Sequence, residues 1–289
     1  MSDVSNFKFE IEAARLADAF KIALEADDSP VVLASEDGLE IYSQCSFAMS
    51  IVARVEFSDF LYYECDTPQM FAIDARQLVK DFKSEKVAEC TFKQRPSSKE
   101  LQRLEVKFGR MKSKYPLLTL DTHAYAGIAR EFINKFERLR AELSTYFYIT
   151  NKDFKELHEL VKKCDLKDPS SAITISIGES VNLRAENSNL YIVYDYTING
   201  DELIELEVSD DSYDGESYYT AMFMDSAMRA LESSSQTLKV YYGVNMPIIM
   251  VSEDESVLAA IAPRVPTDEI EAIKKARVAK KVNKETKSG

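Results

Sequence analysis

The sequence has few of the residues on which active sites and metal centres depend. Its 289 residues include two histidines, four cysteines, eight glycines and no tryptophan. With His123 and His158 as the only imidazoles, neither a zinc site nor a Ser-His or Cys-His dyad is expected. The cysteines form no Cys-x-x-Cys pair and are expected to be small hydrophobic residues; they are Cys45, Cys65, Cys90 and Cys164. We therefore expect no catalytic residue, metal or cofactor, although carboxylate chemistry stays open at this point.

Long apolar runs and glycine-rich phosphate loops are also missing. No run approaches the ~18 residues that cross a membrane, and residues 1–8 contain no signal-peptide core. We therefore expect no membrane contact and a location in the cytoplasm, or in the nucleus if there is one. The formal net charge of -13 argues against nucleic acid as a partner. Net charge is only an average over the chain, however, and a group of basic residues on one face can still bind phosphate.

The order of predicted elements is repeated in the two halves of the chain. A short strand followed by an amphipathic helix occurs at 9–24 and again at 147–162, and each helix leads into alternating apolar strands. A second strand-helix unit follows in each half, at 70–83 and at 219–233, with the second helix placed at 225–233. The pattern predicts an α+β fold of two similar domains, each with two helices on one face of antiparallel sheets.

The segment between the two copies carries its own helical pattern. Its apolar residues, spaced three to five apart, are Ile128, Phe132, Ile133, Phe136, Leu139 and Leu143. One interpretation is a connecting helix packed on a sheet; the other is a mobile connector whose apolar edge helps to form a partner-binding groove. We predict an N-terminal domain at 1–115, this connector at 116–144 and a C-terminal domain at 145–265.

The chain ends in a basic segment. Residues 266–289 contain seven Lys or Arg against four Asp or Glu. This composition predicts a helix that frays into a flexible tail, which either keeps the protein soluble or makes an auxiliary DNA contact.

Several motifs resemble one family. Residues 242–247 read Tyr-Gly-Val-Asn-Met-Pro, and residues 258–265 read Leu-Ala-Ala-Ile-Ala-Pro-Arg-Val. The opening Phe-x7-Leu helix, the Glu-Asp-Gly-Leu-Glu-Ile hairpin at 36–41, the helix after Phe71 and the Tyr-Pro-Leu-Leu at 115–118 follow the same order. The ordered set resembles the PCNA-like DNA sliding clamps of archaea and eukaryotes and spans residues 7–265.

The resemblance implies a non-catalytic scaffold. Three subunits of two domains would form a homotrimeric ring that encircles double-stranded DNA without reading its sequence. Such a processivity factor binds DNA polymerase, a clamp loader and other replication and repair enzymes. It would be nucleoid-associated in an archaeon or virus and nuclear in a eukaryote.

Two alternatives stay open. One is a specialised subunit of a heteromeric ring; the other is an acidic enzyme using Asp210, Asp211 and Asp214, in a loop whose spacing does not fit a calcium site.

The resemblance also implies that helices line the hole and carry the DNA contacts. The basic candidates are Arg15, Lys21, Arg76, Lys80, Lys83, Lys152, Lys155, Lys162, Lys163 and Arg229. Each of them, taken alone, is better explained as part of a solvated helix surface, so the prediction depends on their grouping. Ala17, Asp18, Glu156 and Glu159 stand where the family often has basic residues, so the inner surface is expected to be less positive than usual.

Two further surfaces follow from the resemblance. A partner-peptide groove would be lined by Tyr42, Ser43, Cys45, Phe47, Leu118, Leu120, Met246, Pro247, Ala262, Pro263, Arg264 and Val265, unless Met246 and Ala262 simply cap the second sheet. The subunit interface would pair an edge at 107–115 with an edge at 188–195. Its residues would be Lys107, Arg110, Lys112, Lys114, Leu190, Ile192 and Tyr194. Because the first edge is basic and the second carries Asp195, opposite charge would help to select the pairing.

Overall fold

The structure is a computed structural model that describes residues 7–82, 86–94, 101–120, 126–187, 190 and 192–264. The first half of the chain runs from β1 to β9. Its elements are β1 (Phe7–Glu12), α1 (Ala13–Ala23), β2 (Val31–Ser35), β3 (Gly38–Cys45), β4 (Met49–Glu56), the 3₁₀ turn η1 (Phe57–Asp59), β5 (Phe60–Cys65), β6 (Gln69–Ile73), α2 (Ala75–Asp81), β7 (Val87–Gln94), β8 (Leu101–Phe108) and β9 (Met111–Leu118).

The second half repeats this order after the connector helix α3 (Ala126–Glu142). Among the described residues, the short turn η4 is the one addition. The elements are β10 (Thr145–Thr150), α4 (Asn151–Val161), β11 (Ala172–Ile177), β12 (Ser180–Asn187), β13 (Ile192–Asn199), η3 (Gly200–Glu202), β14 (Glu205–Glu207), η4 (Asp210–Ser212), β15 (Glu216–Thr220), α5 (Ala221–Leu231), β16 (Thr237–Tyr242), β17 (Ile248–Ser252) and β18 (Val257–Ile261). The α+β class is confirmed.

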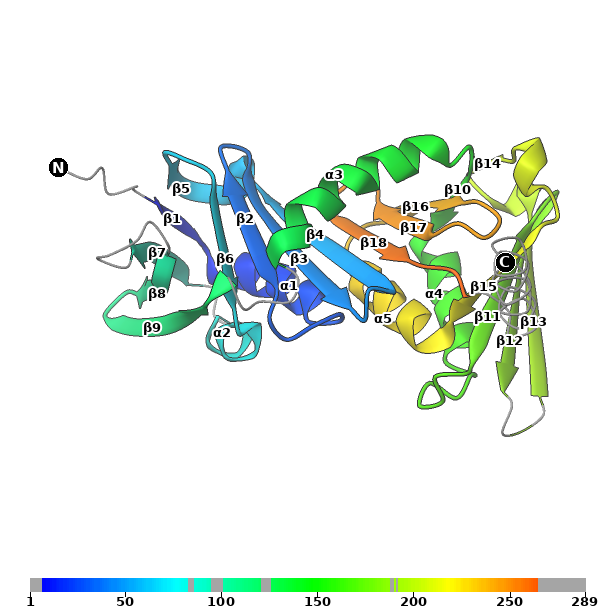
Figure 1. Ribbon diagram of the computed structural model, residues 1–289, viewed down its shortest axis with the longest axis horizontal. Coiled ribbons are helices and arrows are strands. Elements are labelled where there is room, and N and C mark those ends of the chain that lie inside the picture. The colour runs from blue at the N-terminus through cyan, green and yellow to red at the C-terminus, as the bar shows by residue number, and fades with distance from the viewer. Residues whose placement is uncertain are drawn as a thin grey trace, which may run out of the picture.

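One sheet runs through both halves. The described strands form a 14-stranded sheet in the order β14-β10-β16-β17-β18-β4-β3-β2-β6-β9-β8-β7-β1-β5 and a 4-stranded sheet in the order β13-β12-β11-β15. The halves meet where β4 pairs antiparallel with β18, with Met49 opposite Ile261 and Ala53 opposite Val257. We call this pairing the intrachain seam (Figure 1).

The helices cover opposite faces of the sheet at the seam. α1 contacts α2 and α5, and α5 contacts α4, so these four helices form one layer, which we call the helical face. α3 lies on the other side, across the seam (Figure 1). The alternation of side chains along β4 shows both contacts: Ile51 belongs to the core that α5 completes, whereas Val52 is covered by α3. The sheet at the seam is therefore buried on both faces.

Local chemistry explains how individual elements begin. The side chain of Thr150 accepts a hydrogen bond from the Asp153 amide and so caps α4. In the β2–β3 turn, Gly38 has φ +127°, and a Cβ there would lie 2.1 Å from the carbonyl oxygen of Val55. Only glycine fits this turn without displacing the backbone.

The structure moves one predicted boundary in the second half. Within the strand-helix unit expected at 219–233, the helix was placed at 225–233, but β15 ends at Thr220 and α5 begins at Ala221. Ala221, Met224 and Met228 follow helical spacing, and all three are buried in the core. The apolar run at 218–224 continues from strand into helix without a break, so its composition does not mark where the strand ends.

Candidate functional site

Nine of the ten basic residues predicted to contact DNA lie in the described part of the helical layer, and five of these nine are already in ion pairs. Ion pairs join Arg15 to Asp59 at 2.9 Å, Arg76 to Asp28 and Asp74 at 2.9 and 2.7 Å, Lys152 to Glu156 at 3.9 Å, Lys162 to Glu159 at 2.8 Å, and Arg229 to Glu25 and Asp225 at 2.9 and 3.0 Å. These pairs are partly exposed and each neutralises a cation that would otherwise attract phosphate.

Four basic residues of this face have no ion-pair partner within the described residues. They are Lys21, Lys80, Lys155 and Lys163, and all four are exposed. They are spread over the layer, since Lys21 lies on α1, Lys80 on α2, and the other two on or just after α4. Lys83 lies outside the described residues. The described cations of this face that have no ion-pair partner are thus few and dispersed.

A shallow hollow of about 250 Å³ lies between α1 and α5 on this face. Among its lining residues are four cations and three carboxylates, namely Arg15, Lys21, Arg54, Arg229, Asp18, Glu25 and Asp254. Because the charges nearly cancel, the hollow offers no strong binding site for an isolated anion.

A buried polar cluster holds the helical layer together, and sequence reasoning missed it. His158 is fully buried, with Nε2 2.9 Å from Asp225 Oδ1 and Nδ1 hydrogen-bonded to Glu232. Both ring nitrogens of His158 therefore face carboxylate oxygens. Arg229 links the same Asp225 to Glu25 on α1. The sequence did contain a signal for this cluster, since His158 lies on the apolar stripe of α4 and Asp225 on the apolar stripe of α5.

The connector helix covers the outer face of the seam. Its Ala129 and Phe136 are buried against β-strand residues of both halves, including Val52 and Ile249. The ring of Phe132 lies 5.2 Å from the ring of Tyr42. The amphipathic helix predicted here is confirmed, and the structure shows it packed on the sheet.

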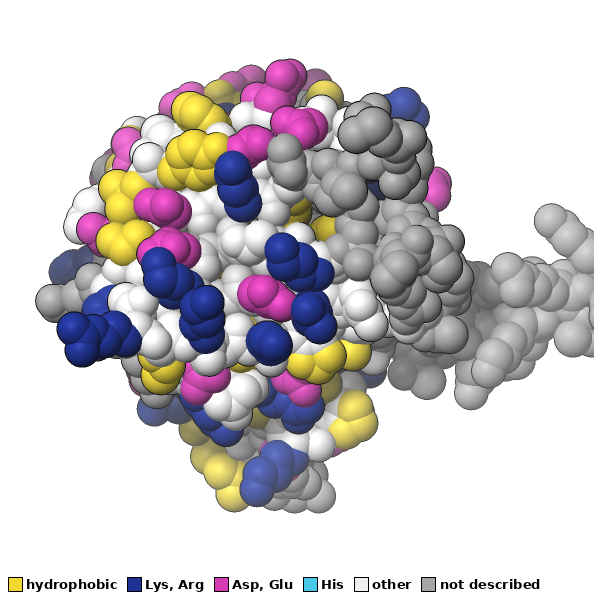
Figure 2. Space-filling view, turned by 90° about the vertical axis from the view of Figure 1, so that its left-hand side faces the viewer, with side chains coloured by type: hydrophobic (Ala, Val, Ile, Leu, Met, Phe, Trp, Pro, Cys, Tyr) yellow, Lys and Arg dark blue, Asp and Glu magenta, His cyan; other side chains and the backbone are white. Residues whose placement is uncertain are grey.

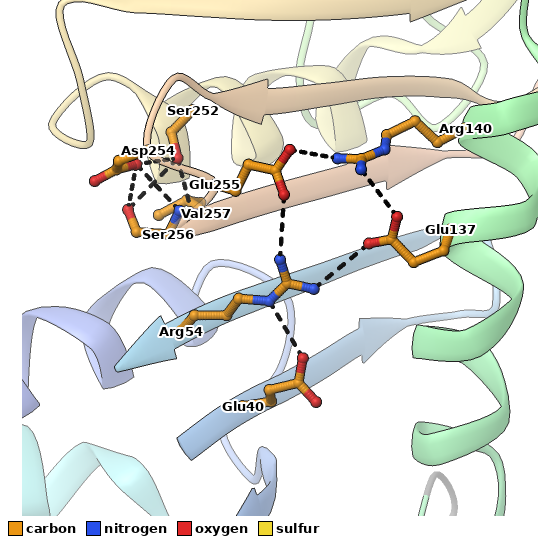
Figure 3. A network of polar contacts seen from close by, with 9 residues as sticks. All are labelled: Glu40, Arg54, Glu137, Arg140, Ser252, Asp254, Glu255, Ser256 and Val257. Carbon is orange, nitrogen blue, oxygen red and sulfur yellow. Dashed lines mark hydrogen bonds and ion pairs between the residues drawn. The ribbon is translucent and has the colours of Figure 1, made fainter. Parts of the chain in front are cut away.

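A network of ion pairs fixes α3 at the seam (Figure 3). Arg54 on β4 reaches Glu40 at 3.2 Å, Glu137 on α3 at 3.6 Å and Glu255 in the β17–β18 turn at 3.8 Å. Arg140 on α3 reaches Glu137 at 3.0 Å and the same Glu255 at 2.8 Å. The network therefore ties α3 to strands from both halves of the chain.

The residues predicted to line a partner groove divide between buried and accessible positions. Tyr42 and Ser43 are buried. Phe47 is 68% exposed at the tip of the β3–β4 hairpin, with φ +57°. The others are partly buried, and they are Cys45, Leu118, Leu120, Met246, Pro247, Ala262, Pro263 and Arg264. Tyr42, Leu118, Leu120 and Met246 share the apolar cluster under α3, and Ala262 donates its amide to the Ala48 carbonyl oxygen. Val265 lies outside the described residues, as does the basic tail.

The two edges predicted to form the subunit interface lie at opposite ends of the molecule (Figure 1). β9 pairs with β8 along its length but with β6 only at Leu117 and Leu118, so its first residues present an open edge. Within the described residues, β13 pairs with β12 alone. Exposed apolar side chains stand at both edges, with Met111 on β9 and Leu190, Ile192 and Val193 at β13.

Basic side chains gather at the β9 end (Figure 2). Arg110, Lys112 and Lys114 are exposed, and Lys107 pairs with Glu89 at 2.6 Å. The opposite end is acidic, because residues 185–228 contain eleven Asp and Glu and no Lys, Arg or His. Tyr194 is partly buried beside this acidic end.

No other chemistry emerges from the described residues. Within them, no group of three or more His, Cys, Asp and Glu side chains is arranged to hold a metal ion, and no helix is long and apolar enough to cross a membrane. Asp210, Asp211 and Asp214 lie in and after the turn η4 rather than around a cleft.

Comparison with known proteins identifies the fold. No family model matches the sequence, and no curated protein matches it. Solved structures do match. The PCNA of A. fulgidus, bound to the C-terminal region of FEN-1, is 15% identical with a TM-score of 0.69, covering 90% of this chain and 99% of that one. The PCNA of Entamoeba histolytica is 13% identical with a TM-score of 0.69, over 90% and 100%. A chain of the Sulfolobus tokodaii PCNA2–PCNA3 complex is 13% identical with a TM-score of 0.63, and the match covers 89% of this chain and 99% of that one.

The chain therefore has the fold of PCNA-type clamps, which confirms at the level of fold the resemblance seen in the sequence. At identities this low, function has to be argued from this chain's own residues.

Proposed function

We propose that this chain is a non-catalytic subunit of a DNA sliding clamp, a ring that encircles duplex DNA. One arrangement carries the proposal: two halves of the same design share a continuous sheet, and their four helices form one face. Within the described residues, a strand edge stands open at each end, at the first residues of β9 and along β13. Residues 1–115 and 145–265 would be its two clamp domains. Repetition of such a unit edge to edge closes a ring with the helical face inside.

The ring would be formed by three copies. β9 of one copy would meet β13 of the next, bringing the basic edge with Lys107, Arg110, Lys112 and Lys114 against the acidic end. Pairing would remove both open edges and cover Met111, Leu190 and Ile192, which are exposed in the single chain.

The helical face would hold DNA loosely. Lys21, Lys80, Lys155 and Lys163 offer long, mobile charges for phosphates, while the paired Arg15, Arg76, Lys152, Lys162 and Arg229 contribute less. Lys83 is proposed as a further contact. Sequence-independent phosphate contacts allow sliding, and retention would come from encirclement rather than from affinity.

The outer side would receive partner proteins such as a polymerase and a clamp loader. Phe47, Met246, Pro247, Ala262 and Pro263 are accessible beside the β3–β4 hairpin, and they are proposed with Cys45, Arg264 and Val265 as the groove. α3 already covers Tyr42, so the region of the groove near Ser43, Leu118 and Leu120 would accept a peptide only at the margin of the helix.

Light scattering over a dilution series is the first test. A mass of three times 32.8 kDa would support the ring. Protein diluted until it dissociates would then be mixed with nicked circular plasmid and concentrated, so that rings close around DNA. Retention on circles and loss after linearisation is the expected result. Equal retention on circular and linear DNA would contradict encirclement.

A heteromeric ring is the second candidate. It is favoured by the structural likeness to a complex of two different PCNA subunits. A chain that stays monomeric at every concentration, yet forms a ring with a sister subunit, would establish it in place of the homotrimer.

A further inference from the structure

The outer face of the 14-stranded sheet continues past the end of α3 onto β16, β10 and β14 (Figure 1). Tyr241 on β16 faces Ile249 on β17, which lies beneath α3, so both belong to this outer face. The alternate residues Phe147 and Ile149 of β10 are buried in the core on the other side. Six side chains remain accessible here, and we call them the tyrosine face: Tyr146, Tyr148, Glu205, Glu207, Lys239 and Tyr241.

Strand register places a glutamate beside each of two tyrosines. Across β10 and β14, Tyr146 faces Glu207 and Tyr148 faces Glu205. Directly opposite residues of an antiparallel pair are close enough for their side chains to interact. The tyrosine face therefore carries two Tyr–Glu pairs, which are two residues apart along each strand.

Lys239 lies between the three tyrosine rings. Its Nζ is 3.8 Å from the ring centroid of Tyr146, 4.7 Å from that of Tyr148 and 4.8 Å from that of Tyr241. An ammonium group is attracted to the electron-rich face of an aromatic ring, so the three rings share one cation. Because Lys239 fills the space between the rings, a further cation would have to lie on the side toward β14, where the two glutamates stand.

The side of the tyrosine face toward β14 is negatively charged. Glu205 and Glu207 are exposed, and neither has an ion pair within the described residues. The hydroxyl of Tyr146 donates a hydrogen bond to Glu205 Oε1 at 2.8 Å. Hydrogen bonds to Glu207 and Glu205 raise the pKa of Tyr146 above its ordinary 10.0, so this hydroxyl stays a donor that holds the carboxylates beside the ring.

We propose that the tyrosine face is a docking surface for an extended segment of a partner protein with arginine at alternate positions, Arg-x-Arg. A guanidinium group is planar, stacks on an aromatic ring and forms two parallel hydrogen bonds to a carboxylate. Each Tyr–Glu pair offers both features. Alternate residues of an extended segment lie roughly 6.6 Å apart, as alternate residues of β10 and β14 do, so two arginines would meet the two pairs in step.

The charge balance selects this occupant. A single nucleic-acid strand also stacks on aromatic rings, but here two carboxylates stand against one ammonium group, and they would repel phosphate. The tyrosine face shares no residue with the predicted peptide groove or with either open edge. Its role therefore does not depend on ring formation, and its test is independent of the tests of the ring.

Fluorescence anisotropy of the full chain with a labelled Thr-Arg-Thr-Arg-Thr peptide tests the surface. Glu205→Lys should raise the dissociation constant about tenfold or more, because it replaces attraction by repulsion. Tyr148→Ala should raise it about two- to fivefold, the contribution of one cation–aromatic contact. A wild-type chain that does not bind the peptide would overturn the proposal and leave the ring untouched.

Two control variants separate the site from general electrostatics. Glu36→Lys makes the same charge change on the exposed β2–β3 turn of the first half. Tyr62→Ala removes an exposed ring that also lies near a lysine, but the neighbouring Glu64 is already paired with Lys8 at 2.7 Å. Both variants should leave the dissociation constant within about twofold. Losses as large as those of Glu205→Lys and Tyr148→Ala would show that only net charge matters and would overturn the proposal.

Two further comparisons test the identity of the occupant. Lysine in place of arginine in the peptide should weaken binding about threefold or more, because an ammonium group is strongly hydrated and has no planar fork. Equal binding of the two peptides would overturn the assignment to arginine. Binding that appears only when the seven Lys and Arg of residues 266–289 are replaced by Gln would make the chain's own basic segment the occupant, and would overturn the assignment to a partner.

Discussion

Nε2 of His158 on α4 lies 2.9 Å from Oδ1 of Asp225 on α5, and the contact is closed off from solvent. Replacing His158 by Ala would leave a cavity and remove the hydrogen-bond partner of Asp225 Oδ1, while the ion pair of Asp225 with Arg229 remains. We expect the free energy of unfolding to fall by about 3 kcal/mol, because a cavity and an unsatisfied buried oxygen both destabilise. Urea denaturation gives the value. A Lys155→Ala variant, altered on the exposed side of the same helix, should change it by less than about 0.5 kcal/mol. Equal losses in both variants would contradict the role of His158.

The same cluster makes the free energy of unfolding depend on pH in the acidic range. Burial acts to raise the pKa of Asp225, but the hydrogen bond from His158 and the charge of Arg229 outweigh it and hold that pKa below its ordinary 3.8. A depressed carboxyl pKa contributes stability that is complete above the unfolded value and is lost as pH falls through the folded value. The stability difference between wild type and Asp225→Asn should therefore stay constant above about pH 5 and shrink below 3.8. A gap that widens toward low pH would refute this account.

The ion-pair network should control how firmly α3 is held. Arg54→Met removes three contacts at once and should lower the free energy of unfolding by about 1–2 kcal/mol, since the Arg54 side chain is only 22% exposed. In the Arg54→Met variant, the backbone amides of α3 should also exchange their hydrogens faster. Arg184→Met is the matched control, because Arg184 has one exposed partner, Glu186. If Arg184→Met loosened α3 to the same degree, the network would not be what fixes the helix.

The four unpaired lysines should dominate DNA contact. Replacing Lys21, Lys80 and Lys155 by Ala should reduce the slope of log affinity against log salt by about 2–3, since each phosphate contact contributes roughly 0.9. A triple variant of exposed cations on α3, at Arg130, Lys135 and Arg138, should leave the slope unchanged because α3 lies on the opposite side of the sheet. Fluorescence anisotropy with a duplex oligonucleotide measures both. A larger loss from the α3 variant would place DNA on the wrong side for a clamp.

Two turn glycines provide a paired test of the fold. Gly38→Ala should destabilise by more than about 2 kcal/mol, because its φ of +127° and the Val55 carbonyl oxygen 2.1 Å from the added Cβ leave no room for the side chain. Gly109→Ala should cost only about 1 kcal/mol, since Gly109 has φ +59° and a Cβ added there would meet no atom within 4 Å. Thermal melts of the two variants measure this difference in stability, and equal melting temperatures would contradict the steric argument.

Much of the fold was predictable because alternation marks strands directly. The sequence pattern predicts strands at 31–35, 49–56, 101–108 and 172–177, and these ranges are the bounds of β2, β4, β8 and β11. The junction of β15 with α5 was not predictable, since its apolar run fits both the period of a strand and the period of a helix. The helix at α3 was predictable from its spacing, but its place across the seam depends on contacts between residues far apart in the chain.

The helices that carry the basic candidates were predictable, but the ion pairs that neutralise half of those candidates were not. The resemblance to clamps predicted Arg15 as a DNA contact, yet its ion-pair partner Asp59 lies 44 residues away. Sequence spacing does not reveal such long-range pairing. For the same reason the cluster around His158 was visible only once α4 and α5 were placed side by side.

The position of α3 has a mechanical consequence. At the intrachain seam, bending the two halves away from each other would have to break a strand ladder, expose the apolar residues under α3 and break the ion pairs of Glu255 with Arg54 and Arg140. At the open edges, the chain supplies only the ladder and its side chains. A ring of these units would therefore behave as stiff segments joined by softer joints. A force that opens it would separate one copy from the next and leave each chain unbent.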